Sequence, residues 1–355
     1  MTTLLLPGLV DVHVHTRDPG QTHKEDWSTA TASALAGGIT TVLAMPNTDP
    51  VIGDGESLAL AEKAARAGAR CDYALYAGAT GANVATVNSL SQRVVGLKMF
   101  LDQSFGDLRL PDLESWWDHL ANWPGSSPVV VHAEGRSLPG ILLMAGWLNR
   151  PIHVCHVSRA DEVALIARAK DRGLPVTCEV TPHHLFLDST HSERLGVAAA
   201  VRPPLADPAD VAALWDHLDV IDCFATDHAP HTWAEKHSPS PPPGFPGVET
   251  MVPLLLTAVH EGRMSLEAML ERLVTNPQRL FGLPAEPDTA VEVDTEESWV
   301  IRAANLHTRC DWTPYEGMEV RGRVTRVTLR GRVVFENGTV KGDPGTGRNL
   351  REESV

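Results

Sequence analysis

Short apolar or β-branched runs alternate, through the first two thirds of the chain, with alanine- and leucine-rich stretches whose apolar positions recur at helical spacing. The runs predict eight strands, at 6–15, 40–46, 72–78, 94–100, 128–133, 152–157, 176–180 and 220–225. The stretches between them predict helices at 25–36, 56–67, 138–148, 160–172 and 208–217. This alternation is typical of an α/β fold, the (β/α)8 TIM barrel, whose functional residues lie at the C-terminal ends of the strands.

The pattern changes after the eighth predicted strand. Helices are expected at 251–260 and 265–274, and short β-type runs follow at 299–301, 324–329 and 332–335. We therefore expect three parts along the chain. They are a barrel at 1–283, a small C-terminal β appendage at 284–341, and a tail or linker at 342–355.

Composition narrows the class of protein. The chain of 355 residues is 43% hydrophobic, which supplies a core, and its five scattered cysteines suit reduced thiols better than disulfides. No stretch approaches a membrane span and the N-terminus lacks a cleavage signal, so we expect a cytoplasmic, soluble protein. The net charge of −15 argues against nucleic-acid or membrane binding, and an anionic small-molecule substrate would need a local basic pocket.

Lys98 is the single charged residue in the apolar run 94–100. Burial in a strand would remove its hydration and lower its pKa, leaving a nucleophilic neutral amine. Such an amine can form a Schiff base, act as a base, or add carbon dioxide to become a carbamate that bridges two metal ions. The plainer alternative is a lysine that extends out of the barrel to a surface carboxylate.

Other polar residues occupy the ends of the predicted strands. Together with Lys98 they are His13 and His15 on the first strand, His132 on the fifth, His156 on the sixth and Asp227 on the eighth. Buried polar groups in such number are costly without a shared ligand, and imidazole with carboxylate favours zinc. We expect two zinc ions, one held by His13, His15 and Asp227 and the other by His132 and His156. Lys98, as a carbamate, would give one oxygen to each.

Four motifs carry a family resemblance. PGLVDVHVH at 7–15, GLKMF at 96–100, CHV at 155–157 and ATDHAPH at 225–231 look like the amidohydrolase superfamily. The chain is similar over nearly its full length to dihydroorotases, particularly to the dihydroorotase domain of the animal multifunctional pyrimidine-synthesis protein. GLPVTCEV at 173–180, PHHLFL at 182–187 and PPPGFPG at 241–247 are especially similar.

The resemblance implies a binuclear zinc centre bridged by carboxylated Lys98. It also implies the reversible cyclisation of N-carbamoyl-L-aspartate to L-dihydroorotate in de novo pyrimidine biosynthesis. In the hydrolytic direction a hydroxide between the metals would attack the ring amide, and Asp227 would take the proton and return it to the ring nitrogen.

The resemblance also assigns residues to the substrate. Arg17 and Asn47 match the residues that hold its carboxylate, and guanidinium forks suit a dianionic molecule. The remaining matches are Arg202, His231, Pro243 and Gly244, together with Ser104 and Phe105 in a mobile loop at 101–110. For that loop, an ordinary strand-to-helix connection is the plainer interpretation.

Cys155 and Glu179 match the ligands of a third zinc in the animal domain. Strand alternation places Cys155 and His156 on opposite faces unless the strand bends there, and without the resemblance Cys155 would be a packed thiol.

Two alternatives and the expected partners complete the sequence-based picture. A hydantoinase or dihydropyrimidinase is disfavoured by Arg17 and Asn47, and a catalytically silent dihydroorotase-like scaffold by the presence of every expected ligand. His13 lies nearer the N-terminus than is usual in such families, as in a domain cut from a longer polypeptide. A homodimer and covalently linked pyrimidine-pathway domains are expected by analogy.

Overall fold

Eight parallel strands form the central sheet of the protein, a computed structural model that describes residues 3–103, 108–124 and 127–352. In sheet order they are β2 (Leu9–Val14), β3 (Ile39–Ala44), β4 (Asp72–Gly78), β5 (Gly96–Phe100), β6 (Val129–His132), β7 (Ile152–Val154), β8 (Val176–Val180) and β9 (Cys223–Phe224). A parallel bridge between Val14 and His228 joins the first strand to the segment after the last, where His15 N donates to His228 O over 2.8 Å. The predicted (β/α)8 barrel is confirmed.

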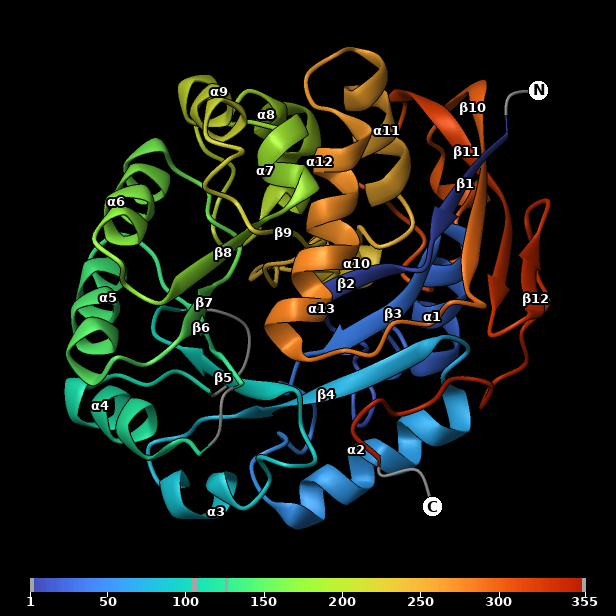
Figure 1. Cartoon of the computed structure of the whole chain (residues 1–355). Coiled ribbons are helices and arrows are strands. Elements are labelled where there is room, and N and C mark those ends of the chain that lie inside the picture. The colour runs from blue at the N-terminus through green and yellow to red at the C-terminus, as the bar shows by residue number, and fades with distance from the viewer. Residues whose placement is uncertain (1–2, 104–107, 125–126, 353–355) are drawn as a thin grey trace.

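Helices surround the strands, as Figure 1 shows. Those between barrel strands are α1 (Trp27–Ala36), α2 (Gly55–Gly68), α3 (Val84–Asn88), α4 (Leu113–Asn122), α5 (Ser137–Leu148), α6 (Ala160–Asp171), α7 (Pro182–Phe186), α8 (His191–Leu195) and α9 (Pro208–Asp216). After β9 come α10 (Trp233–Lys236), α11 (Met251–His260), α12 (Leu266–Leu270) and α13 (Asn276–Phe281). A π-helical segment at Glu271–Thr275 joins the last two. No helix within the described ranges is long and apolar enough to cross a membrane.

Strand alternation decides which side chains face the barrel interior. On β5, Leu97 and Met99 belong to the apolar cluster that includes the surrounding helices, so Lys98 between them points inward. On β6, Val129 and Val131 belong to the same outer cluster, and His132 ends the strand on the inner side.

A second sheet lies beside the barrel (Figure 1) and has the order β1–β10–β11–β12–β13. Its strands are β1 (Thr3–Pro7), β10 (Ala290–Val300), β11 (Glu319–Leu329), β12 (Arg332–Glu336) and β13 (Thr339–Val340). The predicted single strand 6–15 is therefore two strands, and β1 pairs antiparallel with β10 from Thr3↔Asp294 to Pro7↔Ala290. The break falls at Gly8, where an added Cβ would lie 2.6 Å from Thr40 Oγ1 and 2.7 Å from Thr289 Cγ2.

The described part of the tail, 342–352, is docked on the barrel rather than frayed. Tyr73 N donates to Arg348 O over 2.9 Å, and Leu350 N donates back to Tyr73 O over 2.8 Å. Gly345 N and Gly347 N both donate to Ala69 O over 2.9 Å. Leu350 also packs against the apolar cluster that includes Val10 and Val12.

We predict that truncation after residue 341 lowers the thermal unfolding midpoint by more than about 3 °C, because at least five backbone hydrogen bonds, the four above and that from Gly342 N to Val334 O, are lost at roughly 1 kcal/mol each. The measurement is a calorimetric scan beside a control truncated after residue 352. Equal midpoints for the two truncated proteins would contradict the stabilising role of the tail.

Candidate active site

Three polar side chains from opposite ends of the barrel sequence meet at one point. His15 Nε2 lies 2.9 Å from Asp227 Oδ1, and His13 Nε2 lies 3.2 Å from the same oxygen. Val14 between the two histidines packs in the outer apolar cluster, so alternation turns both imidazoles towards Asp227. The ligand atoms of the three residues all lie within 4.8 Å of one another, so they could share one metal ion.

Asn47 sets the tautomer of His15. Its Oδ1 lies 2.6 Å from His15 Nδ1, so the ring carries a proton on Nδ1 and donates it to Asn47. Burial lowers the pKa of His15 to about 4, which keeps the ring neutral. The lone pair of Nε2 then faces a carboxylate oxygen, and two acceptors at that distance repel unless a cation lies with them. The donor set therefore fits a metal ion.

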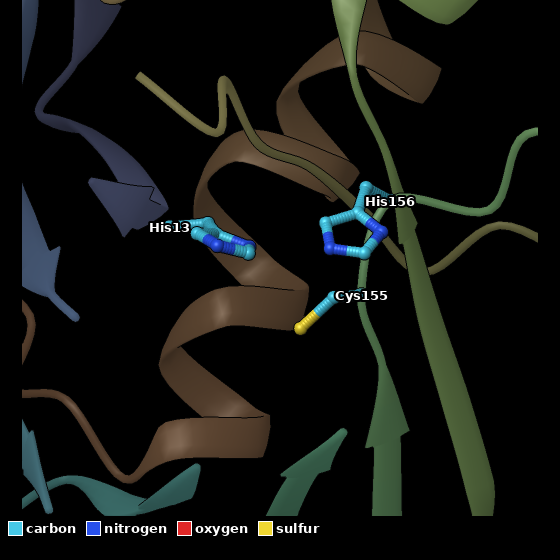
Figure 2. A group of neighbouring side chains, drawn as sticks. All are labelled: His13, Cys155 and His156. Atoms are coloured by element: carbon cyan, nitrogen blue, oxygen red, sulfur yellow. The ribbon is translucent and has the colours of Figure 1, made fainter. Parts of the chain in front are cut away.

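A second group of ligand atoms is formed by His13, Cys155 and His156, which also lie within 4.8 Å of one another. Figure 2 shows the His13 ring opposite the two neighbouring residues, with the Cys155 sulfur directed back towards it. Strand β7 ends at Val154, and His156 has a φ of 36°, so the chain bends where alternation would have separated the two side chains. His156 Nδ1 is buried with no hydrogen-bond partner in the described residues, as expected for a nitrogen that binds a metal.

Lys98 lies inside the barrel, with none of its surface exposed. Its Nζ donates to Cys155 Sγ over 2.7 Å and lies 5.0 Å from the centre of the Phe100 ring. A lysine that extends to the surface is therefore excluded. The amine instead points at the cluster that contains His13 and His156.

His132 and Glu179 both contact this cluster. The His132 ring centre is 4.5 Å from that of His156, and His132 Nε2 lies 2.8 Å from Glu134 Oε1. Glu179 Oε1 lies 2.5 Å from His13 Nδ1 and accepts from His156 N over 3.3 Å.

The electrostatics of the cluster favour a cation. Burial opposes the charged form of His13, but Glu179 and Asp227 outweigh it and raise the pKa of that imidazole to about 10. Burial likewise opposes the charge on Asp227, yet His13 and His15 hold its pKa well below the usual range. Two buried carboxylates that stay ionised beside three imidazoles are the electrostatic surroundings that suit divalent metal ions.

Several supporting residues were not singled out from the sequence. His153 Nε2 lies 3.1 Å from Glu179 Oε2 and orients that carboxylate. Asp11 accepts from Thr226 N over 3.1 Å and from His13 N over 3.2 Å, which ties together the segments that carry His13 and Asp227. His153 and Asp11 are each a polar residue inside an apolar strand. This is the pattern that singled out Lys98, and it could have identified these two residues as well.

Arg17 and His231 lie next to the cluster and are buried in contact with each other. Arg17 Nε donates to Pro230 O over 3.1 Å, and its Nη2 lies 3.1 Å from His231 Nε2. Lys24 Nζ lies 3.2 Å from His231 Nδ1. Burial, followed by the charges of Arg17 and Lys24, holds the pKa of His231 far below its usual value, so this ring is neutral between two cations. A net-negative protein thus buries positive charge at one place beside its metal-type ligands.

The other predicted substrate residues differ in their position relative to His231 and in their exposure to solvent. The Pro243 carbonyl oxygen lies 3.0 Å from His231 Nε2, and Gly244 has a φ of 144°, where an added Cβ would lie 2.4 Å from Ala229 O. Arg202 is exposed, between buried Val201 and Pro203. Ser104 and Phe105 fall outside the described residues.

Comparison with known proteins places these features in a family. A family model described as "Dihydro-orotase-like" matches residues 2–89. The chain is 52% identical over 347 residues to "Multifunctional protein CAD" of Squalus acanthias, covering 98% of this chain but only 16% of that protein. It is 36% identical over 371 residues to "Dihydroorotase" of Pyrococcus abyssi, covering 98% of this chain and 88% of that enzyme.

A solved structure agrees with the fold. "L-Hydantoinase (Dihydropyrimidinase) from Arthrobacter aurescens" superposes with a TM-score of 0.93 at 26% identity, covering 98% of this chain and 89% of that one. The match to the Pyrococcus enzyme spans nearly all of both chains at more than 30% identity. The chain belongs to the dihydroorotase family.

Proposed function

We propose that this protein is a zinc-dependent dihydroorotase that interconverts N-carbamoyl-L-aspartate and L-dihydroorotate in de novo pyrimidine biosynthesis. The observation that carries the proposal is a buried group of basic side chains, Arg17, Lys24 and His231, beside a cluster of metal-type ligands. Arg17 follows His15 by two residues, and His231 follows Asp227 by four, so the same two strand ends supply both. A cyclic amide that bears a carboxylate needs both features.

The proposed metal ligands fall into sets. His13, His15 and Asp227 would hold one zinc, His132 and His156 a second, and carboxylated Lys98 would lie between them. Cys155 and Glu179 would hold a third; His13, whose two nitrogens face Asp227 and Glu179, lies between the two groups of ligands. Bound zinc would lower the pKa of a water and polarise the amide carbonyl.

The chain's own groups would bind the substrate and move its proton. Arg17, with Asn47 and Arg202, would hold the carboxylate, while His231, Pro243 and Gly244 would line the ring. Asp227, kept ionised by His13 and His15, would accept the proton of the attacking water and deliver it to the ring nitrogen that leaves. In ring closure the same carboxylate would act in reverse order. A loop with Ser104 and Phe105 would exclude water above the ring.

The two alternative functions are less well supported by these contacts. A hydantoinase acts on a ring without a carboxylate, so a buried arginine beside the proposed metal ligands would have no substrate anion to bind. A silent scaffold would have no need of the ligand geometry of His13, His15 and Asp227.

We further propose a cytoplasmic protein that binds a small molecule and neither nucleic acid nor membrane. The barrel would comprise 1–283, with the appendage at 284–341 and the tail at 342–355. Covalently linked pyrimidine-pathway domains are proposed because the matched CAD protein is multifunctional by name. A homodimer is supported by an apolar face on α4 and α5, where Leu113, Trp117, Leu143 and Trp147 are all exposed and the two tryptophan rings lie 6.5 Å apart.

Lys98→Ala is expected to abolish zinc binding at the bridged pair and to lower turnover of dihydroorotate by at least roughly a thousandfold, because activation of water and polarisation of the carbonyl are lost together. Elemental analysis and turnover of carbamoyl aspartate, dihydroorotate and hydantoin are the measurements. Lys63→Ala, at an exposed position on α2, is the control. Full activity in Lys98→Ala would rule out Lys98 as the ligand between two zinc ions. Turnover of hydantoin alone by wild type would overturn the proposal that dihydroorotate is the substrate.

Cys155→Ser is expected to reduce the zinc content by one ion per chain, since a serine hydroxyl is a much weaker zinc ligand than a thiolate. The matched control is Cys223→Ser, a buried barrel cysteine in neither ligand group. An unchanged zinc content in Cys155→Ser would leave that cysteine a packed thiol.

Arg17→Met is expected to raise KM for dihydroorotate by roughly ten- to a hundredfold. This is the loss of binding expected when one hydrogen-bonded charge pair with the substrate carboxylate is removed. Dihydrouracil, which has the same ring without the carboxylate, serves as the internal control and should be unaffected or improved. Equal losses for both substrates would show that Arg17 supports the fold of the site rather than the carboxylate.

A further inference from the structure

Lys236, the last residue of α10, is fully buried and has no part in the mechanism above. Its Nζ donates to three backbone carbonyl oxygens, those of Ala200 over 2.6 Å, Pro242 over 3.0 Å and Gly244 over 3.1 Å. Burial lowers the pKa of Lys236 to about 7. Three acceptors at these distances, however, can be satisfied only by the three hydrogens of the ammonium form, so the contacts favour the charge.

These carbonyls come from two loops that are far apart in the sequence. Ala200 precedes the turn that carries Arg202, while Pro242 and Gly244 flank Pro243, whose own carbonyl contacts His231. One ammonium therefore links the loop before β9 to the loop after it. Gly244 N also donates to Ala200 O over 3.0 Å, so this oxygen accepts a hydrogen bond from the other loop as well as from Lys236.

Aromatic rings complete the surroundings of Lys236. Its Nζ lies 5.5 Å from the centre of the Phe245 ring and 5.4 Å from that of Trp312. Trp312 Nε1 donates to His231 O over 2.7 Å, so the residue that packs on the ammonium also holds the backbone of His231. The backbone of His231 is thus held by a residue that packs on Lys236, and its side chain contacts Pro243, whose two neighbours accept hydrogen bonds from Lys236.

We propose that Lys236 is a positioning residue for substrate recognition, setting the arrangement of Arg202, His231, Pro243 and Gly244 around the bound ring. The proposal rests on the dihydroorotase function proposed above. A purely apolar side chain could fill the same volume, but it would remove a donor from all three carbonyls and leave Ala200 O with only Gly244 N, so the two loops would move to find other partners. None of the three carbonyls belongs to a metal-ligand residue, so the zinc centre itself should remain intact.

The test is Lys236→Met, which keeps the length of the side chain and removes its three donors. Expected results are a KM for dihydroorotate raised at least roughly tenfold, kcat within about threefold of wild type, and an unchanged zinc content. Dihydroorotate should also raise the thermal midpoint of Lys236→Met less than that of wild type. A solely structural role would lower stability without this division between KM and kcat.

Lys170→Met is the matched control. Lys170 Nζ also donates to a backbone carbonyl, that of Val220 over 2.6 Å, and pairs with Asp222, but it lies on α6 and contacts no residue assigned to the substrate. It should lose stability and keep its KM. Lys236→Gln, which retains two donors, is the milder variant should Lys236→Met aggregate, and its KM should be raised by a smaller factor.

The outcomes separate the two proposals. If wild type turns over neither dihydroorotate nor carbamoyl aspartate, the proposed function fails. If wild type is active and Lys236→Met, or Lys236→Gln in its place, keeps the wild-type KM, the positioning role is overturned. A fall in zinc content would also overturn it, because the effect would then pass through the metal centre.

Discussion

The contact of Asp227 with His13 and His15 is the constraint on which the rest of the structure depends. It joins the end of the first barrel strand to the end of the last, at the point where Val14 and His228 close the sheet. Asp227 has a φ of 46°, His156 of 36° and Arg17 of 61°, conformations that cost of order 1–3 kcal/mol each for residues with a side chain. The surrounding barrel holds the backbone in these strained conformations near three strand ends. The conformations direct the side chains of Asp227, His156 and Arg17 towards the candidate site.

Charged side chains are buried at the end of the barrel where His13, His15 and Asp227 meet. The protein carries 45 acidic and 30 basic residues, yet Arg17, Lys24, Lys98 and Lys236 are all buried at this end of the barrel. Arg17, Lys24 and Lys236 face carbonyl oxygens or an imidazole, Lys98 faces a thiol, and Glu179 and Asp227 supply negative charge nearby. Such a mixed cluster suits metal cations bound beside an organic anion, because buried charges are stabilised by opposite charges at short range.

The sequence was informative wherever a residue broke the pattern of its own strand. Lys98 was found because an isolated lysine contradicts an apolar run, and its inward direction follows from alternation alone. The strand boundary at Gly8 was missed because residues 6–10 carry no polar side chain, and only the packing of Thr40 and Thr289 shows where the chain must change sheets. Most of β10 was missed because its acidic stretch near Glu292 and Asp294 resembles an exposed turn, while its pairing partners lie at the N-terminus and in β11.

Contacts made by the backbone explain what remained hidden around the candidate site. Lys236 belongs to a segment without periodicity, and its three partners are carbonyls, which are present at every residue and carry no sequence signal. The bend at Cys155 and His156 depends on a single dihedral angle, which composition does not encode for a non-glycine residue. The nature of the site could thus be predicted from side-chain chemistry, whereas the positioning of its loops could not.

The second sheet takes part in the site rather than standing apart from it. Strand β1 leads through Gly8 directly into the strand that carries His13, and the segment between β10 and β11 reaches the substrate end of the barrel. There Thr308 Oγ1 donates to Glu25 over 2.5 Å, and Trp312 holds the backbone of His231. A change in the small sheet would therefore displace the strand that carries His13 at one end and the backbone of His231 at the other. The appendage is part of the frame that holds these two residues at a fixed separation.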